Sequence, residues 1–318
     1  MACLIALVGT GLAAVVLIVT HRIESRVTKL ENPFADLPNR PGKESKATNF
    51  LLVGSDSRTS GGNPKKWAFG AQRTDAILLV NISGRRDSVN VVSIPRDSWV
   101  DVPGHGMNKV NAAYSYGGAP LLIQTVEKLT KVHVDHLMVM DFDGFSAVTD
   151  SLGGVTIDVG TSTTFTGKLH AGRQRLNGSQ ALSYVRERYG LPNGDFDRVK
   201  RQQNWMRAIF SELLSKGTLL NPVKLTNSLE KIAENVAVDE GFTFGKARDL
   251  ASGLRGIRAD DLRFTTVPVT GTGTSKDGQS IVKLDSKNSG KLFEAMAGDS
   301  MNEWFKANQG ALLGSNVN

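Results

Sequence analysis

The sequence predicts an α/β fold: a single domain in which helices flank a central mixed β-sheet, with a transmembrane helix at the N-terminus. Short β-rich runs alternate with segments of helical periodicity from about residue 48 onward. The chain has 318 residues and 40% hydrophobic content, which is enough for one substantial core. Its opening stretch, Met1 to Thr20, carries no charged side chain.

That opening stretch approaches the roughly 20 apolar residues that span a bilayer, so we expect a membrane anchor at residues 1–20. A cleaved signal peptide is the alternative, but no small-x-small cleavage site follows the apolar run. Arg22, Arg26 and Lys29 follow the stretch and nothing basic precedes it. The positive-inside rule, read literally, would place the domain in the cytoplasm; a start codon assigned too late would explain this. Residues 21–47 are polar and contain prolines, as expected of a linker.

The domain proper is expected at residues 48–300, followed by a C-terminal tail at 301–318. NFLLVG and DAILLVNI are apolar runs typical of buried strands, and SGRRD between DAILLVNI and SVNVVSIP predicts a hairpin. APLLIQTVEKLTK has apolar residues at helical spacing. Patterns of these two kinds predict strands at 49–54, 75–82, 88–95, 134–141, 155–159, 262–269 and 280–285, and helices at 119–131, 142–152, 177–184, 197–216, 222–235, 244–257 and 289–297.

The composition restricts the function without choosing it. A net charge of +7 favours an anionic partner, whether nucleic acid, a membrane face, a phosphorylated lipid or an acidic wall polymer. The only cysteine is Cys3, so an internal disulfide and a cysteine-based zinc site are both excluded. No Walker A, Rossmann or GxSxG pattern is present.

The densest group of charges lies in YVRERYGLPNGDFDRVKRQQ. On the expected helix, Arg198, Arg201 and Gln202 share a face by the i, i+3, i+4 rule, while Arg186 and Arg188 share a face if they are extended. Arginine binds phosphate oxygens bidentately and stays charged, so these rows suit one large anion. A solvated basic surface paired with nearby acids is an equally good interpretation of the composition.

Further polar side chains lie where strands meet loops. Arg73 and Arg96 flank strands and are candidates for a diphosphate site, or for structural ion pairs with Asp75 or Asp97. Asp56 and Asp75 suit Mg²⁺ or Mn²⁺, which take one or two carboxylates together with phosphate oxygens; loop capping is the alternative for Asp56. Lys109 and Asn111 line a polar pocket or close a turn, and the sequence does not decide which.

Six blocks together resemble the LytR-CpsA-Psr family, over about residues 48 to 300. These blocks, in the family's order and spacing, are NFLLVGSDSR, RTDAILLV, VVSIPRDSWVDVPG, NKVNAAYSYGG, DHLMVMDFDGFSAVTDSLGGVTIDV and YVRERYGLPNGDFDRVKRQQ. The resemblance implies an extracytoplasmic, membrane-anchored domain that binds a polyprenyl-pyrophosphate carrier. It implies transfer of a glycopolymer, such as teichoic acid, arabinogalactan or capsule, to a peptidoglycan sugar hydroxyl.

The resemblance also assigns roles residue by residue. Asp56 and Asp75 match the family's acids for Mg²⁺ or Mn²⁺, and the matching pyrophosphate-binding set is Arg73, Arg96, Arg186, Arg188, Arg198 and Gln202. Arg58 and Asp97 lie beside these positions as possible helpers, and Arg201, Lys109 and Asn111 complete the expected substrate-binding residues. Asp75 is the first candidate for the general base.

Two other functions are considered for this chain. Water in place of the sugar hydroxyl would make the protein a metal-dependent polyprenyl-pyrophosphate phosphatase. A membrane-tethered nucleic-acid regulator fits the basic charge, but the sequence has no helix-turn-helix, RRM or KH pattern and only 7% aromatic residues for base stacking. We therefore expect membrane lipid, the lipid-linked polymer and peptidoglycan as partners, and no nucleic acid.

Overall fold

The computed structural model describes residues 24–55, 74–160, 169–187, 191–314 and 317. The expected anchor at residues 1–20 lies outside these ranges, as do Asp56, Arg58, Arg73 and Arg188. Among the helices that fall inside these ranges, none combines the length and apolar character needed to cross a bilayer.

A seven-stranded mixed sheet forms the centre of the domain, as the sequence predicts. Its order is β1-β10-β7-β2-β3-β4-β11. The neighbours β2–β3, β3–β4 and β7–β10 are antiparallel, whereas β2–β7, β4–β11 and β1–β10 are parallel. The strands are β1 (Thr28–Leu30), β2 (Thr48–Ser55), β3 (Thr74–Ile82), β4 (Val89–Ile94), β7 (His136–Asp141), β10 (Val236–Asp239) and β11 (Leu262–Thr266).

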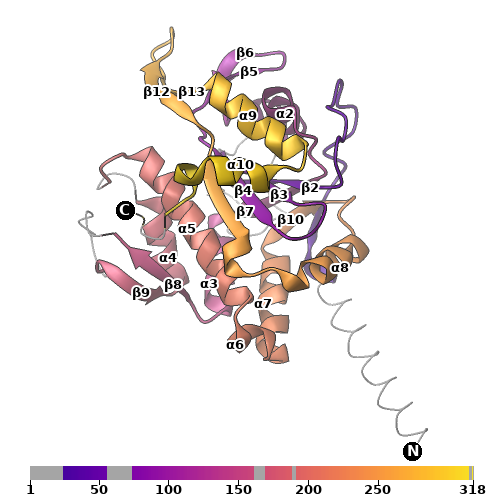
Figure 1. Ribbon diagram of the computed structural model, residues 1–318, viewed down its shortest axis with the longest axis vertical. Coiled ribbons are helices and arrows are strands. Elements are labelled where there is room, and N and C mark those ends of the chain that lie inside the picture. Colours follow the sequence, from indigo (N-terminus) through magenta and orange to yellow (C-terminus); the bar gives the residue numbers. More distant parts are fainter. Residues whose placement is uncertain (1–23, 56–73, 161–168, 188–190, 315–316, 318) are drawn as a thin grey trace, which may run out of the picture.

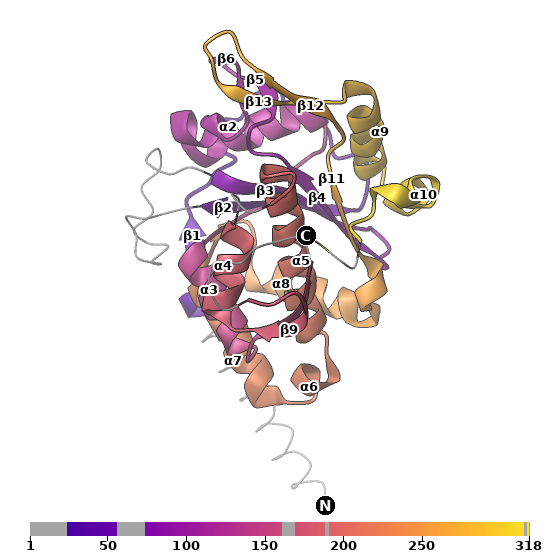
Figure 2. The same ribbon diagram turned by 90° about the vertical axis from the view of Figure 1, so that its left-hand side faces the viewer.

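Helices cover both faces of this sheet and give three layers (Figures 1 and 2). One face is covered by α2 (Ala112–Thr130), α9 (Ser286–Ala297) and α10 (Met301–Ala307), with Leu122, Leu292 and Phe305 in the shared core. The other face carries α3 (Phe142–Ser151), α4 (Gly178–Arg186), α5 (Asp195–Leu213), α6 (Lys216–Leu219), α7 (Pro222–Glu234) and α8 (Phe244–Gly253). Strands β2, β3 and β4 are buried on both sides, which explains their nearly continuous apolar sequence.

Three two-stranded hairpins lie outside the main sheet. They are β5 (Trp99–Val102) with β6 (Gly106–Lys109), β8 (Val155–Val159) with β9 (Gly172–Leu176), and β12 (Val269–Thr274) with β13 (Ser280–Leu284). The first and third hairpins lie on the α2 side of the sheet (Figure 2). A parallel bridge between Ser98 and Val282 joins them.

The structure differs from the sequence-based expectations at several boundaries. Helix α2 begins at Ala112 and not at residue 119, because it includes an additional turn before a kink at Gly117 and Gly118. The run expected as one strand at 262–269 is divided between β11 and β12. In the segment expected as a linker, β1 pairs with β10, and in the expected tail Phe305 and Val317 are buried.

Candidate active site at the strand ends

Six charged side chains from four segments of the chain meet where β3 begins and β4 ends, and we call them the strand-end cluster: Asp75, Arg96, Asp97, Lys109, Asp195 and Arg198. Arg96 follows β4 and forms an ion pair with Asp75 of β3. Strands β3 and β4 are antiparallel, so the first residues of one lie beside the last residues of the other. This topology brings together two side chains from separate sequence motifs.

Helix α5 contributes the cluster's remaining acid and arginine. Asp195 stands in its first turn, where a carboxylate is favoured by the helix dipole. Its Oδ1 lies 2.7 Å from Nη2 of Arg198 and 3.5 Å from Nη2 of Arg96. Asp195 therefore links two guanidinium groups that come from the sheet and from the helix.

Hairpin β5–β6 contributes a third cation. Nζ of Lys109 lies 3.1 Å from Oδ1 of Asp97, whose Oδ2 lies 3.6 Å from Nε of Arg96. The backbone N–H of Asn111 donates to the carbonyl of Arg96 at 3.2 Å. Asn111 thus fixes the loop after β4 through its main chain.

The cluster is largely shielded from water and its charges balance. Side-chain exposure is 17% for Arg96 and 10% for Arg198. Burial acts to lower the pKa of Arg96, but the nearby carboxylates of Asp195, Asp75 and Asp97 outweigh it and raise that pKa. In the described part of the chain, the cluster's three cations and three carboxylates cancel.

Several buried polar atoms in or next to the cluster lack a hydrogen-bond partner among the described residues. Within the described ranges, Oγ1 of Thr74, Nε of Arg96 and Oγ of Ser98 have no hydrogen-bond partner. Such atoms are rare in folded proteins unless a ligand or water completes them. Each belongs to the cluster or to a residue next to one of its members.

A buried amide holds α5 against the sheet. Nε2 of Gln203 donates to Oγ of Ser93 at 2.6 Å, to the carbonyl of Thr265 at 2.7 Å and to Oγ1 of Thr266 at 3.1 Å. Gln203 is 1% exposed. It lies on the same helix as Arg198, so it fixes the helix that presents that arginine.

The other expected site residues on α4 and α5 lie in different surroundings. Arg201 is fully buried; its guanidinium carbon lies 4.6 Å from the ring centroid of Tyr184, and burial lowers its pKa. Gln202 is 9% exposed and follows Arg198 by one helical turn. Arg186 is the last residue of α4, not part of a strand, and is exposed. Arg198, Arg201 and Gln202 are all buried on α5, as residues that share one helix face can be.

Asp195 is the acid that sequence reasoning did not assign to the site. It is one of the acids near the arginine-rich segment, and it forms an ion pair with Arg198. What the sequence could not show is that this half-buried pair lies beside Arg96. Its position three residues before Arg198, in the first turn of a helix, is the signal that was available.

A divalent metal ion is only partly provided for by the described residues. Asp75 supplies one carboxylate beside a cluster of arginines, which suits Mg²⁺ or Mn²⁺ bound jointly with a phosphate. Nowhere in residues 24–55, 74–160, 169–187, 191–314 and 317 do three or more His, Cys, Asp or Glu side chains gather as metal ligands. The second expected ligand, Asp56, lies outside these ranges.

Comparison with known proteins gives a consistent assignment. The LytR_cpsA_psr family model matches residues 18–298. The chain is 32% identical to "Cell wall biosynthesis protein LcpA" of Corynebacterium glutamicum over 80% of its own length and 56% of that protein, so it spans little more than half of this relative. It is 33% identical to "Probable cell wall biosynthesis protein LcpB" of the same organism, over 88% of this chain and 67% of that one.

A solved structure shares the fold as well. The crystal structure of Bacillus subtilis TagV has a TM-score of 0.66 at 26% identity, covering 82% of this chain and 99% of TagV. The family model spans most of the sequence, and the mixed sheet with its flanking helices agrees with that structure. The chain belongs to the LytR-CpsA-Psr family.

Proposed function

We propose that this protein transfers a cell-wall glycopolymer from a polyprenyl-pyrophosphate carrier to a sugar hydroxyl of peptidoglycan. The observation that carries the proposal is the convergence of Arg96, Arg198 and Lys109 with half-buried carboxylates at the strand ends. Family membership and the cell-wall names of the curated relatives support the same reaction class.

The balanced charge of the strand-end cluster favours a site completed by further cations. Three described cations facing three carboxylates give little net attraction for a diphosphate. Mg²⁺ or Mn²⁺ held by Asp75, together with Asp56, would neutralise charge on the diphosphate. Arg73, Arg188 and Arg58 are the expected additional cations. With the metal ion and these arginines offsetting the carboxylates, Arg96 and Arg198 would be available to bind phosphate oxygens.

The proposed chemistry is one phosphoryl displacement. The acceptor hydroxyl oxygen bonds to the phosphorus that carries the polymer, and the bond from that phosphorus to the bridging oxygen of the diphosphate breaks. Polyprenyl phosphate leaves with the electron pair, and a phosphodiester joins polymer to acceptor. Arg96 and Arg198 stabilise the charge that develops on the leaving phosphate.

The acceptor proton requires a base near the strand-end cluster. Asp75 is the first candidate, although a carboxylate that also binds a metal is a weak base. Asp97, which is paired with Lys109 of hairpin β5–β6 and lies near Arg96, is another carboxylate of the cluster. The proposal places the domain outside the cytoplasm, anchored in the membrane through residues 1–20.

Product analysis tests this proposal. The full chain in detergent is incubated with a labelled lipid-linked polymer, Mg²⁺ and soluble peptidoglycan fragments, and the products are identified by mass spectrometry. A phosphodiester conjugate is the expected product. Free polymer phosphate in place of the conjugate would instead establish the phosphatase. If neither product forms although the donor binds, the proposal is wrong.

A further inference from the structure

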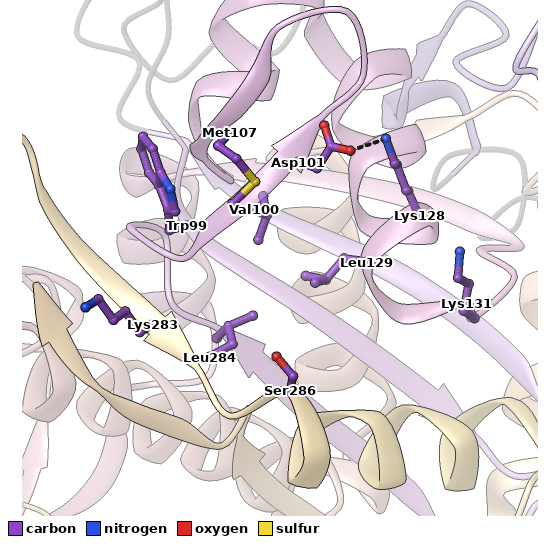
Figure 3. Close-up of a pocket in the computed structure, with 10 residues that line it drawn as sticks. All are labelled: Trp99, Val100, Asp101, Met107, Lys128, Leu129, Lys131, Lys283, Leu284 and Ser286. Carbon is purple, nitrogen blue, oxygen red and sulfur yellow. Dashed lines mark hydrogen bonds and ion pairs between the residues drawn. The ribbon is translucent and has the colours of Figure 1, made fainter. Parts of the chain in front are cut away.

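A groove of about 480 Å³ opens on the α2 side of the sheet, between hairpin β5–β6, the end of α2 and strand β13 (Figure 3). Its apolar surface includes Trp99, Met107, Leu129 and Leu284. Met107 is 52% exposed, although it is a large hydrophobic residue. The groove therefore presents apolar groups to solvent beside the proposed active site.

The groove is also basic. Lys128, Lys131 and Lys283 line it, and Asp101 balances the charge of Lys128. In the part of the chain that the structure describes, neither Lys131 nor Lys283 forms an ion pair. The carbonyl end of α2 favours a nearby cation such as Lys131, but Lys283 precedes the N-terminus of α9, where the helix dipole disfavours one. Helix stabilisation does not account for Lys283.

The hairpin connects this groove to the strand-end cluster. Trp99 is paired with Lys109, and Asp101 with Met107, so these four side chains share one face of β5–β6. Lys109 on this face reaches Asp97 of the cluster. On the neighbouring strand, the N–H of Val282 donates to the carbonyl of Asp97 at 2.9 Å. A chain lying in the groove would thus lead toward Arg96.

The groove and helix α5 reach the strand-end cluster from opposite faces of the sheet. Arg198 reaches the cluster from the helical layer on one face of the sheet, whereas the groove lies with α2 on the other (Figure 2). A donor diphosphate held by Arg96 and Arg198 would leave the groove side for the second reactant. This arrangement suits two substrates that meet at the strand ends.

We propose that the groove binds the acceptor, a strand of sugar rings that carries carboxylates, and the assignment rests on the function proposed above. Apolar faces of sugar rings lie against Trp99 and Met107, because an indole offers a flat apolar surface with a polar edge. Acceptor carboxylates pair with Lys131 and Lys283. A polyprenyl chain is disfavoured here because it would bury two unpaired ammonium groups.

The test compares Lys131→Glu/Lys283→Glu with Lys246→Glu/Lys306→Glu, which reverses two exposed lysines outside the groove. Full-length proteins are tested for cosedimentation with peptidoglycan stripped of attached polymer, and for the KM of acceptor and of lipid-linked donor. We expect the groove variant to lose at least tenfold in peptidoglycan binding and to raise the acceptor KM at least tenfold. The donor KM and the control variant should stay within twofold of wild type.

A second variant separates the groove's role from general misfolding. Trp99→Leu keeps an apolar side chain but removes the indole, and we expect it to raise the acceptor KM with an unchanged melting temperature. A rise in the donor KM alone would assign the groove to the donor's polymer and overturn the proposal. Wild-type values for both groove variants would also overturn it. Peptidoglycan binding needs no turnover, so a failure of the transfer reaction is distinguishable from a failure of the groove.

Discussion

Asp195 lies 3.5 Å from Arg96, and the same carboxylate oxygen holds Arg198 at 2.7 Å. One acid in the first turn of α5 therefore sets the relative position of two guanidinium groups from different layers of the fold. It also neutralises part of the charge that a diphosphate would use. These two effects of one side chain can be separated by experiment.

Replacing Asp195 with Asn should tighten the binding of inorganic pyrophosphate while slowing transfer. Removing one negative charge from a half-buried cluster increases its attraction for an anion by about three- to tenfold after solvent screening. The loss of the ion pair with Arg198 leaves the guanidinium less well oriented. Titration calorimetry with pyrophosphate and a transfer assay would measure both quantities.

Asp87→Asn is the matched control, because Asp87 pairs with Arg85 at an exposed turn. It should leave both quantities unchanged. Weaker pyrophosphate binding in Asp195→Asn would mean that Asp195 does not compete with the anion.

Replacing Gln203 with Leu should lower the free energy of unfolding by about 2–4 kcal/mol. The change leaves Oγ of Ser93 and the carbonyl of Thr265 buried without their donor, and each such group costs about 1–3 kcal/mol. Urea denaturation followed by circular dichroism would measure the loss. A value within 0.5 kcal/mol of wild type, on the order of a surface substitution, would show that the amide does not hold α5.

Replacing Arg40 with Ala should destabilise the domain by about 2–4 kcal/mol, since it leaves a buried carboxylate without its cation. Glu127 is 2% exposed and accepts from Nε of Arg40 at 3.0 Å and from Nη2 at 2.7 Å. Lys43→Ala, which breaks a more exposed pair with Asp135, should cost less than about 1 kcal/mol. Equal melting temperatures for the two variants would show that the Arg40–Glu127 pair does not stabilise the domain more than the exposed pair does.

Stability should fall at high pH through Tyr114. Burial raises the pKa of Tyr114 from about 10 to about 12. Because the pKa is higher in the folded state, the contribution of the protonated phenol to the free energy of unfolding is complete below pH about 10. It is lost as the pH rises toward about 12. Between these pH values, the free energy of unfolding of Tyr114→Phe should fall by about 1–3 kcal/mol less than that of wild type, since one pKa unit corresponds to roughly 1.4 kcal/mol.

Urea denaturation of wild type and Tyr114→Phe at a series of pH values would measure this difference. Tyr116→Phe is the control, because that ring is 51% exposed. Parallel pH profiles for wild type and Tyr114→Phe would contradict a role for the buried phenol.

The sequence predicted the central sheet well because its strands are strongly apolar. NFLLVG and DAILLVNI became the inner strands β2 and β3, and the hairpin between β3 and β4 was confirmed. The peripheral strands β8 and β13 were also predicted, whereas β5, β6 and β9 were not. Strand β6 has the sequence GMNK, and it forms by pairing with β5, which local residue preferences do not reveal.

The sequence also identified most described members of the strand-end cluster, but not how they connect. Arg96 and Asp75 were named from motifs, and their proximity follows from antiparallel pairing of β3 and β4. The link through Asp195 depends on where α5 packs, which Gln203 helps to fix through contacts distant in the chain. Arg201, which was expected at the substrate, contacts Tyr184, a tertiary contact that helical periodicity alone cannot specify.

The most direct test of the central claim is the affinity of the full chain for a short-chain polyprenyl pyrophosphate in the presence of Mg²⁺. Calorimetry would compare wild type with Arg96→Ala and with Arg85→Ala, whose guanidinium is 73% exposed at the far end of the β3–β4 pair. We predict that Arg96→Ala binds at least about 30-fold more weakly, from about 2 kcal/mol for a lost charge-assisted hydrogen bond, and that Arg85→Ala binds as wild type does. Equal affinities for all three proteins would contradict a diphosphate site at the strand ends.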